Sequence, residues 1–130
     1  GRDLTESGLR EILNYGHTLA HAIERANDYT WRHGDAVAVG CCFAARLSAQ
    51  RGLLGAEEVA LHDELFARVG LPTRYEDSSL EELTHIMASD KKVRRGILRF
   101  VLLDGIANPS TLTVEPNELV APARAIGIDA

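Results

Sequence analysis

Apolar residues at helical spacing predict two long helices in the first half of the chain. The first spans Thr5 to about Asn27, with Thr5 or Ser7 as its N-cap. The second covers about 35–51 and is apolar nearly all round, which is typical of a helix at the centre of a bundle. Only a short loop, 28–34, separates the two, so we expect them to pack as an antiparallel pair.

Shorter helices are predicted in the second half. A third helix covers about 56–69 and is ended by Gly70-Leu71-Pro72. A capping box, Ser79-Leu80-Glu81-Glu82, begins a fourth helix that runs to about Ser89. Another short helix is expected near 117–125. None of these segments repeats another in sequence.

A β-hairpin is predicted between the last two of these helices. Residues 97–103 alternate and are rich in β-formers, Asp104-Gly105 is a turn signal, and 111–114 can supply the returning strand. The expected fold is therefore mainly α, a multi-helix bundle with a small hairpin near the C-terminus. Its 130 residues are the length of a single domain.

Charge and hydropathy exclude two classes of partner. The chain has 14 basic and 19 acidic residues, a net charge of −5, which argues against non-specific binding to nucleic acid. No run of 18 apolar residues occurs, so no membrane span is predicted. The polar start shows no signal peptide, and Gly1 in place of methionine is expected for a segment of a longer protein.

The two cysteines are neighbours, Cys41 and Cys42, within the predicted central helix. Adjacent helical residues point about 100° apart, so a disulfide between them is geometrically poor. We interpret both as small buried hydrophobes in a reducing compartment, which indicates a cytoplasmic protein.

Four polar residues of the first predicted helix form one stripe. Arg10, Asn14, His17 and His21 are spaced by 4, 3 and 4 residues, which places them within roughly 60° around the helix axis. Gly16 costs a helix about 1 kcal/mol relative to alanine. A glycine beside His17 has a use, because it lets another backbone, a cofactor or a substrate approach closely.

Histidines at i and i+4 can share a divalent metal. His33, in the loop before the central helix, can join His17 and His21 if the helices pack antiparallel. By pattern alone, a metal or anion site and ordinary surface imidazoles remain equally open, whereas His62 and His85 are interpreted as ordinary helix residues. The basic segment after the fourth helix is either a solvated connector or an anion-binding loop.

Several motifs together resemble one family. They are Leu13–Glu24 (LNYGHTLAHAIE), Arg32–Gly40 (RHGDAVAVG), Gly70-Leu71-Pro72, Asp90-Lys91-Lys92-Val93 and Leu98–Leu103. In this order and spacing they resemble the C-terminal domain of 3-dehydroquinate synthase. The resemblance covers nearly all of the chain, and the first motif is the most specific of them.

The resemblance implies a metal- and NAD-dependent enzyme of which this chain is one part. His17 and His33 would be ligands of Zn²⁺ or Co²⁺, with a glutamate of the preceding chain as the third ligand. NAD would be bound mainly by an N-terminal Rossmann-like domain that is absent from residues 1–130. That domain would be the chain's partner, a homodimer is compatible with the resemblance, and the chain alone is expected to be inactive.

The resemblance also implies how a sugar-phosphate substrate is bound. His21 would be the catalytic histidine near the departing phosphate. Arg10, Asn14 and Lys91 would bind the substrate's anionic and hydroxyl groups, with Lys92 as the alternative to Lys91. The family converts 3-deoxy-D-arabino-heptulosonate 7-phosphate to 3-dehydroquinate and phosphate, a lyase step of the shikimate pathway towards chorismate and the aromatic amino acids.

Two departures from the family pattern leave an alternative open. Asp35 stands where glutamate is usual, and Ala20 replaces a common glycine. Both are compatible with a related sugar-phosphate cyclase of secondary metabolism, such as an aminodehydroquinate synthase. A metal-dependent alcohol or glycerol dehydrogenase is a weaker alternative, because those enzymes lack the Arg10–Asn14 pair together with the lysine loop.

Overall fold

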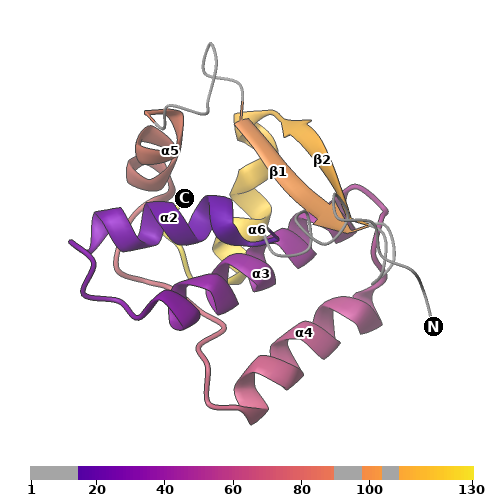
Figure 1. The fold of residues 1–130 in the computed structure, drawn as a ribbon. Helices are drawn as coiled ribbons and strands as arrows, with labels where there is room; N and C mark the ends of the chain where they lie inside the picture. The colour runs from indigo at the N-terminus through magenta and orange to yellow at the C-terminus, as the bar shows by residue number, and fades with distance from the viewer. Residues whose placement is uncertain (1–14, 90–97, 104–108) are drawn as a thin grey trace.

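The computed structural model describes residues 15–89, 98–103 and 109–130, and these form a helical domain with one hairpin (Figure 1). The elements in chain order are α2 (His17–Ala26), α3 (His33–Gln50), α4 (Ala56–Arg68), α5 (Leu80–Ala88), β1 (Leu98–Leu103), β2 (Pro109–Val114), the 3₁₀ helix η1 (Pro116–Leu119) and α6 (Val120–Ala125). The mainly α class with a C-terminal hairpin is confirmed. The predicted turn at Asp104-Gly105 lies outside the described residues.

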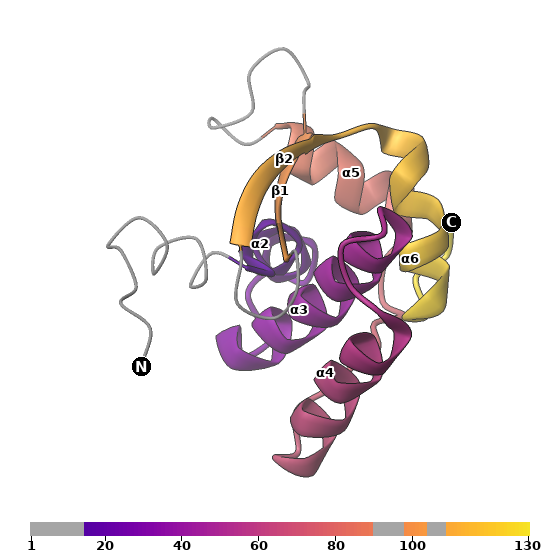
Figure 2. The ribbon, with the colours of Figure 1, turned by 90° about the vertical axis from the view of Figure 1, so that its right-hand side faces the viewer.

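Helix α3 lies at the centre of the domain, as its apolar composition predicts. Most of its residues between Ala36 and Ser48 are buried, and it contacts α2, α4, α6 and β1. Figure 2 shows α3 between α2, α6 and the hairpin, with α4 projecting away from the rest. None of the helices in the described ranges is both long and apolar enough to cross a bilayer.

The predicted helix from Thr5 to Asn27 is not continuous, and that prediction is wrong. Helix α2 begins at His17, directly after Gly16, whose φ is +88°. A left-handed residue cannot continue a right-handed helix, so the chain changes direction at this glycine. His17 and His21 share α2, whereas Arg10 and Asn14 precede the break and lie outside the described residues.

The hairpin is joined to the central helix through a buried serine. Strands β1 and β2 pair antiparallel, with Leu98 opposite Val114 and Leu103 opposite Pro109. The Ser48 hydroxyl on α3 donates to the carbonyl of Ala44 at 2.7 Å and accepts the backbone N–H of Leu103 at 3.1 Å. A fully buried hydroxyl is thereby satisfied on both sides.

Both cysteines are free and buried, which confirms their interpretation as small core residues. The Cys41 thiol donates to the carbonyl oxygen of Tyr15 at 3.3 Å. Burial raises the pKa of both thiols to about 12, so they stay protonated at neutral pH. Neither thiol is suited to nucleophilic chemistry, which requires the thiolate.

Helix α4 has no buried residue, although Val59 and Phe66 pack partly buried against the core, and polar contacts join it to α3. Arg46 of α3 donates to both carboxylate oxygens of Asp63, at 2.6 and 3.1 Å. His62 donates from Nδ1 to the carbonyl of Glu58, so its Nε2 is left to accept from the hydroxyl of Tyr15 at 3.3 Å. His62 therefore links α4 to Tyr15, a contact that the sequence pattern around His62 does not indicate.

Asp63→Asn is expected to loosen α4 at neutral pH by about 1 kcal/mol or less, because the ion pair is partly exposed. Burial acts to raise the pKa of Asp63, but hydrogen bonds and charge from Arg46 outweigh it and lower that pKa below the ordinary 3.8. The contribution is therefore present above pH 3.8 and is lost as the pH falls through the lower folded-state pKa.

Hydrogen exchange of the α4 amides measures this effect, with Glu64→Gln as the control. Glu64 forms only an exposed ion pair with Arg68 on the same helix, so its loss should change little. Faster exchange in Asp63→Asn at pH 7, with the difference shrinking at acid pH, is the expected result. Equal exchange in the two variants would contradict it.

Candidate metal centre

Two glycines allow α2 and α3 to touch through their backbones. A Cβ atom at Gly40 would overlap the carbonyl of Gly16, and one at Gly16 would lie 2.6 Å from the backbone nitrogen of Cys41. Side chains larger than hydrogen cannot fit at this crossing. The glycine next to His17 thus serves the close approach of another backbone, which is the use predicted for it.

The packing of α2 against α3 brings the side chain of His17 close to that of His33. Gly40 lies beside Gly16, while His33, seven residues earlier on α3, lies beside Glu24 near the end of α2. The ring centroids of His17 and His33 are 5.4 Å apart, and those of His17 and His21 are 6.0 Å apart. Three imidazoles therefore lie close together where α2 and α3 pack.

His17 presents a neutral imidazole. Burial lowers its pKa below the usual 6.5, and the neighbouring His33 and His21 lower it further. Its Nδ1 atom is buried and has no hydrogen-bond partner among the described residues. A buried, unpaired imidazole nitrogen is costly in a folded protein, and metal coordination or a hydrogen bond from outside these residues would remove that cost.

His33 is the first residue of α3, not a loop residue as predicted, and its ring is held by a carboxylate. Nδ1 of His33 lies 3.0 Å from Oε1 of Glu24. An ionised carboxylate only accepts hydrogen bonds, so we assign a proton to Nδ1, which leaves Nε2 as the ring atom available to a metal. Metal-ligating histidines usually have such a carboxylate or carbonyl partner.

Glu24 is the functional side chain that our reading of the sequence missed. It follows His17 by seven residues and His21 by three, so all three share a face of α2. That spacing was the available signal. Asp35, the carboxylate nearest to His33 in sequence, has no hydrogen bond to His33 among the described contacts.

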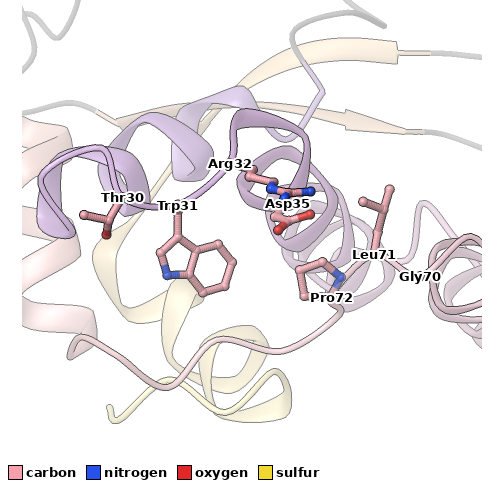
Figure 3. A pocket seen from close by; sticks show the side chains of 7 residues that line it. All are labelled: Thr30, Trp31, Arg32, Asp35, Gly70, Leu71 and Pro72. Atoms are coloured by element: carbon pink, nitrogen blue, oxygen red, sulfur yellow. The ribbon is translucent and has the colours of Figure 1, made fainter.

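Asp35 faces a separate cavity of about 500 Å³ beside the start of α3. In Figure 3, Asp35 and Arg32 lie next to Pro72, with the Trp31 indole on the adjacent side. The indole N–H donates to a carboxylate oxygen of Asp77 at 3.1 Å. The other departure from the family pattern, Ala20, is fully buried in the core.

The residues present fit part of a metal site. Two imidazoles this close together are typical zinc or cobalt ligands, and a catalytic zinc usually has three protein ligands. Within residues 15–89, 98–103 and 109–130, no three His, Cys, Asp or Glu side chains converge closely enough to form a complete set. Arg10, Asn14, Lys91 and Lys92 lie outside the described residues, so their predicted roles stay predictions.

Comparison with known proteins shows where this fold and its motifs recur. A family model described as 3-dehydroquinate synthase C-terminal matches residues 1–93. The 3-dehydroquinate synthase of Saccharopolyspora erythraea is 52% identical over 121 residues, which are 93% of this chain and 33% of that protein. That of Nocardia farcinica is 53% identical over 121 residues, 93% of this chain and 32% of that protein.

Solved structures give the same answer for the fold. A 2-deoxy-scyllo-inosose synthase complexed with carbaglucose-6-phosphate, NAD⁺ and Co²⁺ superposes with a TM-score of 0.76 at 28% identity, covering 88% of this chain and 33% of that chain. A 2-epi-5-epi-valiolone synthase from Streptomyces hygroscopicus has a TM-score of 0.77 at 23% identity, covering 87% of this chain and 32% of that chain, and so shows the fold alone.

The fold is that of the helical domain shared by these synthases. By its sequence the chain belongs to the 3-dehydroquinate synthase C-terminal family. It spans about a third of the length of the curated relatives it matches.

Gly40→Ala is expected to separate α2 from α3 and displace His17 from His33. Overpacking of this kind costs about 1–3 kcal/mol, and bound metal should fall with it. Gly34→Ala is the matched control, because a Cβ there meets nothing within 4 Å although it adjoins His33. Thermal unfolding and metal analysis of the full-length protein check this. A Gly40→Ala protein as stable and metal-loaded as Gly34→Ala would contradict it.

Proposed function

We propose that this chain is the metal-binding helical domain of a 3-dehydroquinate synthase, a carbon–oxygen lyase of the shikimate pathway. The full-length protein would convert 3-deoxy-D-arabino-heptulosonate 7-phosphate to 3-dehydroquinate and phosphate. Family membership supports this, and the observation that carries it is the convergence of His17, His21 and His33, with ring centroids 5.4 and 6.0 Å apart around His17.

His17 and His33 would hold a Zn²⁺ or Co²⁺ ion, with a glutamate of the N-terminal domain as the third ligand. The related 2-deoxy-scyllo-inosose synthase, 28% identical, has been solved with Co²⁺ and NAD⁺. A divalent metal supplies coordination of neighbouring hydroxyls and polarisation of a carbonyl, and NAD supplies reversible hydride exchange. In support, Nδ1 of His17 has no hydrogen-bond partner among the described residues, and Nδ1 of His33 is the ring atom that contacts Glu24, which leaves Nε2 for a metal.

His21 is the proton-handling residue of the proposed reaction. It lies one turn after His17 on the same face of α2 and is exposed to solvent. Its ring is therefore accessible to a substrate bound at the surface. An imidazole beside a departing phosphate can deliver a proton to the leaving oxygen. Arg10, Asn14 and Lys91 are proposed to hold the substrate's anionic and hydroxyl groups in line.

The chain supplies only part of this machinery. NAD would bind mainly to the N-terminal Rossmann-like domain, so the isolated chain is proposed to be inactive and to bind metal weakly through two imidazoles. The cysteines, which are free and buried, support a reducing, cytoplasmic location.

A related sugar-phosphate cyclase is the second candidate function. It is favoured by the structural likeness to 2-deoxy-scyllo-inosose synthase at a TM-score of 0.76. The curated relatives at 52% and 53% identity are named 3-dehydroquinate synthase, and this higher similarity favours the heptulosonate substrate.

Phosphate release by the full-length protein separates the two functions. With NAD and Zn²⁺ or Co²⁺, the heptulosonate phosphate should yield one phosphate per 3-dehydroquinate formed, without net accumulation of NADH. Phosphate release from another sugar phosphate, and none from the heptulosonate phosphate, would establish the second candidate. Net NADH production with a simple alcohol would overturn both.

Alanine variants should separate the two metal ligands from the proton-handling histidine. His17→Ala and His33→Ala are expected to weaken Zn²⁺ binding by more than the roughly 10–100-fold typical of outer-shell changes. His21→Ala should retain the metal and lose about 10²–10⁴-fold in kcat, the usual contribution of acid–base catalysis.

Metal analysis and steady-state kinetics of the full-length variants make the measurement. His85→Ala, an exposed histidine on α5, is the control and should behave as wild type. Full metal occupancy in His33→Ala would show that the imidazole pair is not the binding site.

A further inference from the structure

The contact between Glu24 and His33 lies beside the proposed metal site. Oε1 of Glu24 lies 3.0 Å from Nδ1 of His33. The Glu24 side chain is only 13% exposed, whereas that of His33 is 59% exposed. Among the described residues, no lysine or arginine pairs with Glu24. The His33 imidazole is therefore the charged or polar side chain that compensates for the burial of its carboxylate. Burying a carboxylate is costly without such a partner.

The loop after α2 reverses the chain so that His33 lies beside Glu24. Asp28 and Tyr29 both adopt left-handed backbone angles, with φ of 52° and 61°, which are uncommon for residues other than glycine. Asn27 fastens the start of this loop, because its side-chain amide donates to Ile23 O at 2.8 Å and to the Tyr75 hydroxyl at 2.6 Å. The chain reverses direction, and α3 begins opposite the last turn of α2.

The hydrogen bond to Glu24 affects how the His33 imidazole can bind a metal. A hydrogen bond from Nδ1 to a carboxylate selects one tautomer, orients the ring and makes Nε2 a better electron donor. Glu24 and His17 also lie on the same face of α2, seven residues apart. One helix therefore carries the first imidazole and the group that orients the second.

We propose that Glu24 is a positioning residue of the metal site, holding His33 so that Nε2 is presented to the metal beside His17. Asp35, the nearest carboxylate in sequence to His33, does not have this role, because it lines the cavity next to Trp31 and Pro72. The proposal rests on the metal site of the proposed function, and it concerns metal affinity, whichever sugar phosphate is the substrate.

The test compares Glu24→Ala, Glu24→Gln and Asp35→Asn in the full-length protein. Zn²⁺ affinity is measured by competition with a chromophoric chelator, and the ligand field by the visible absorption of the Co²⁺-substituted protein. Glu24→Ala should weaken Zn²⁺ binding about 10–100-fold, the usual effect of losing such a partner. Glu24→Gln should weaken it less, because the amide oxygen still accepts the Nδ1 proton. Asp35→Asn should match wild type.

A purely structural role for Glu24 gives a different result. It would lower the thermal unfolding midpoint while the folded fraction kept wild-type Zn²⁺ affinity and an unchanged Co²⁺ spectrum, and that result overturns the proposal. Equal weakening by Asp35→Asn and Glu24→Gln would overturn it as well, since the effect would then be one of general charge.

The failure of the proposed function is distinguishable from failure of this inference. If wild type binds Zn²⁺ through His33 but releases no phosphate from the heptulosonate phosphate, the function fails and the role of Glu24 stands on its affinity data. If His33→Ala binds Zn²⁺ as tightly as wild type, the metal site itself is refuted, and the role of Glu24 with it.

Discussion

The backbone contact between Gly16 and Gly40 is the constraint on which the rest of the site depends. At this point α2 and α3 approach so closely that neither position has room for a Cβ atom. The contact fixes where α2 starts, and His17 is its first residue. Since α3 runs antiparallel to α2, the same crossing also sets how far His33 lies from His17. A small change in helix separation would therefore alter the spacing of the imidazoles.

The central helix makes this close contact stable. Small side chains on α3, among them Ala36, Cys41 and Ala44, are buried against its neighbours, and small side chains let helices approach closely. The other end of α3 is fastened to the hairpin by Ser48 and to α4 by Arg46. The histidines thus stand on elements whose relative positions are determined well away from the site, which is how a rigid site is usually supported.

The polar groups at the helix starts give the site its proposed chemistry. His17 is kept neutral by burial and by neighbouring imidazoles, and His33 is oriented by Glu24. In the proposed site these two residues would leave room for a third protein ligand and for substrate, as is typical of catalytic rather than structural zinc. The chain spans about a third of its curated relatives, so a site shared between two domains agrees with its size.

Local sequence determined the helices and the hairpin, because periodicity, caps and turn residues act over a few positions. It also determined that His17 and His21 share a helical face. Only the tertiary structure decided that Gly16 breaks the first predicted helix, that His33 opens α3, and that Glu24 contacts its ring. These three outcomes depend on how α2 packs against α3. That packing decides which backbone angle Gly16 adopts and which carboxylate lies beside His33, and neither follows from the neighbouring residues in sequence.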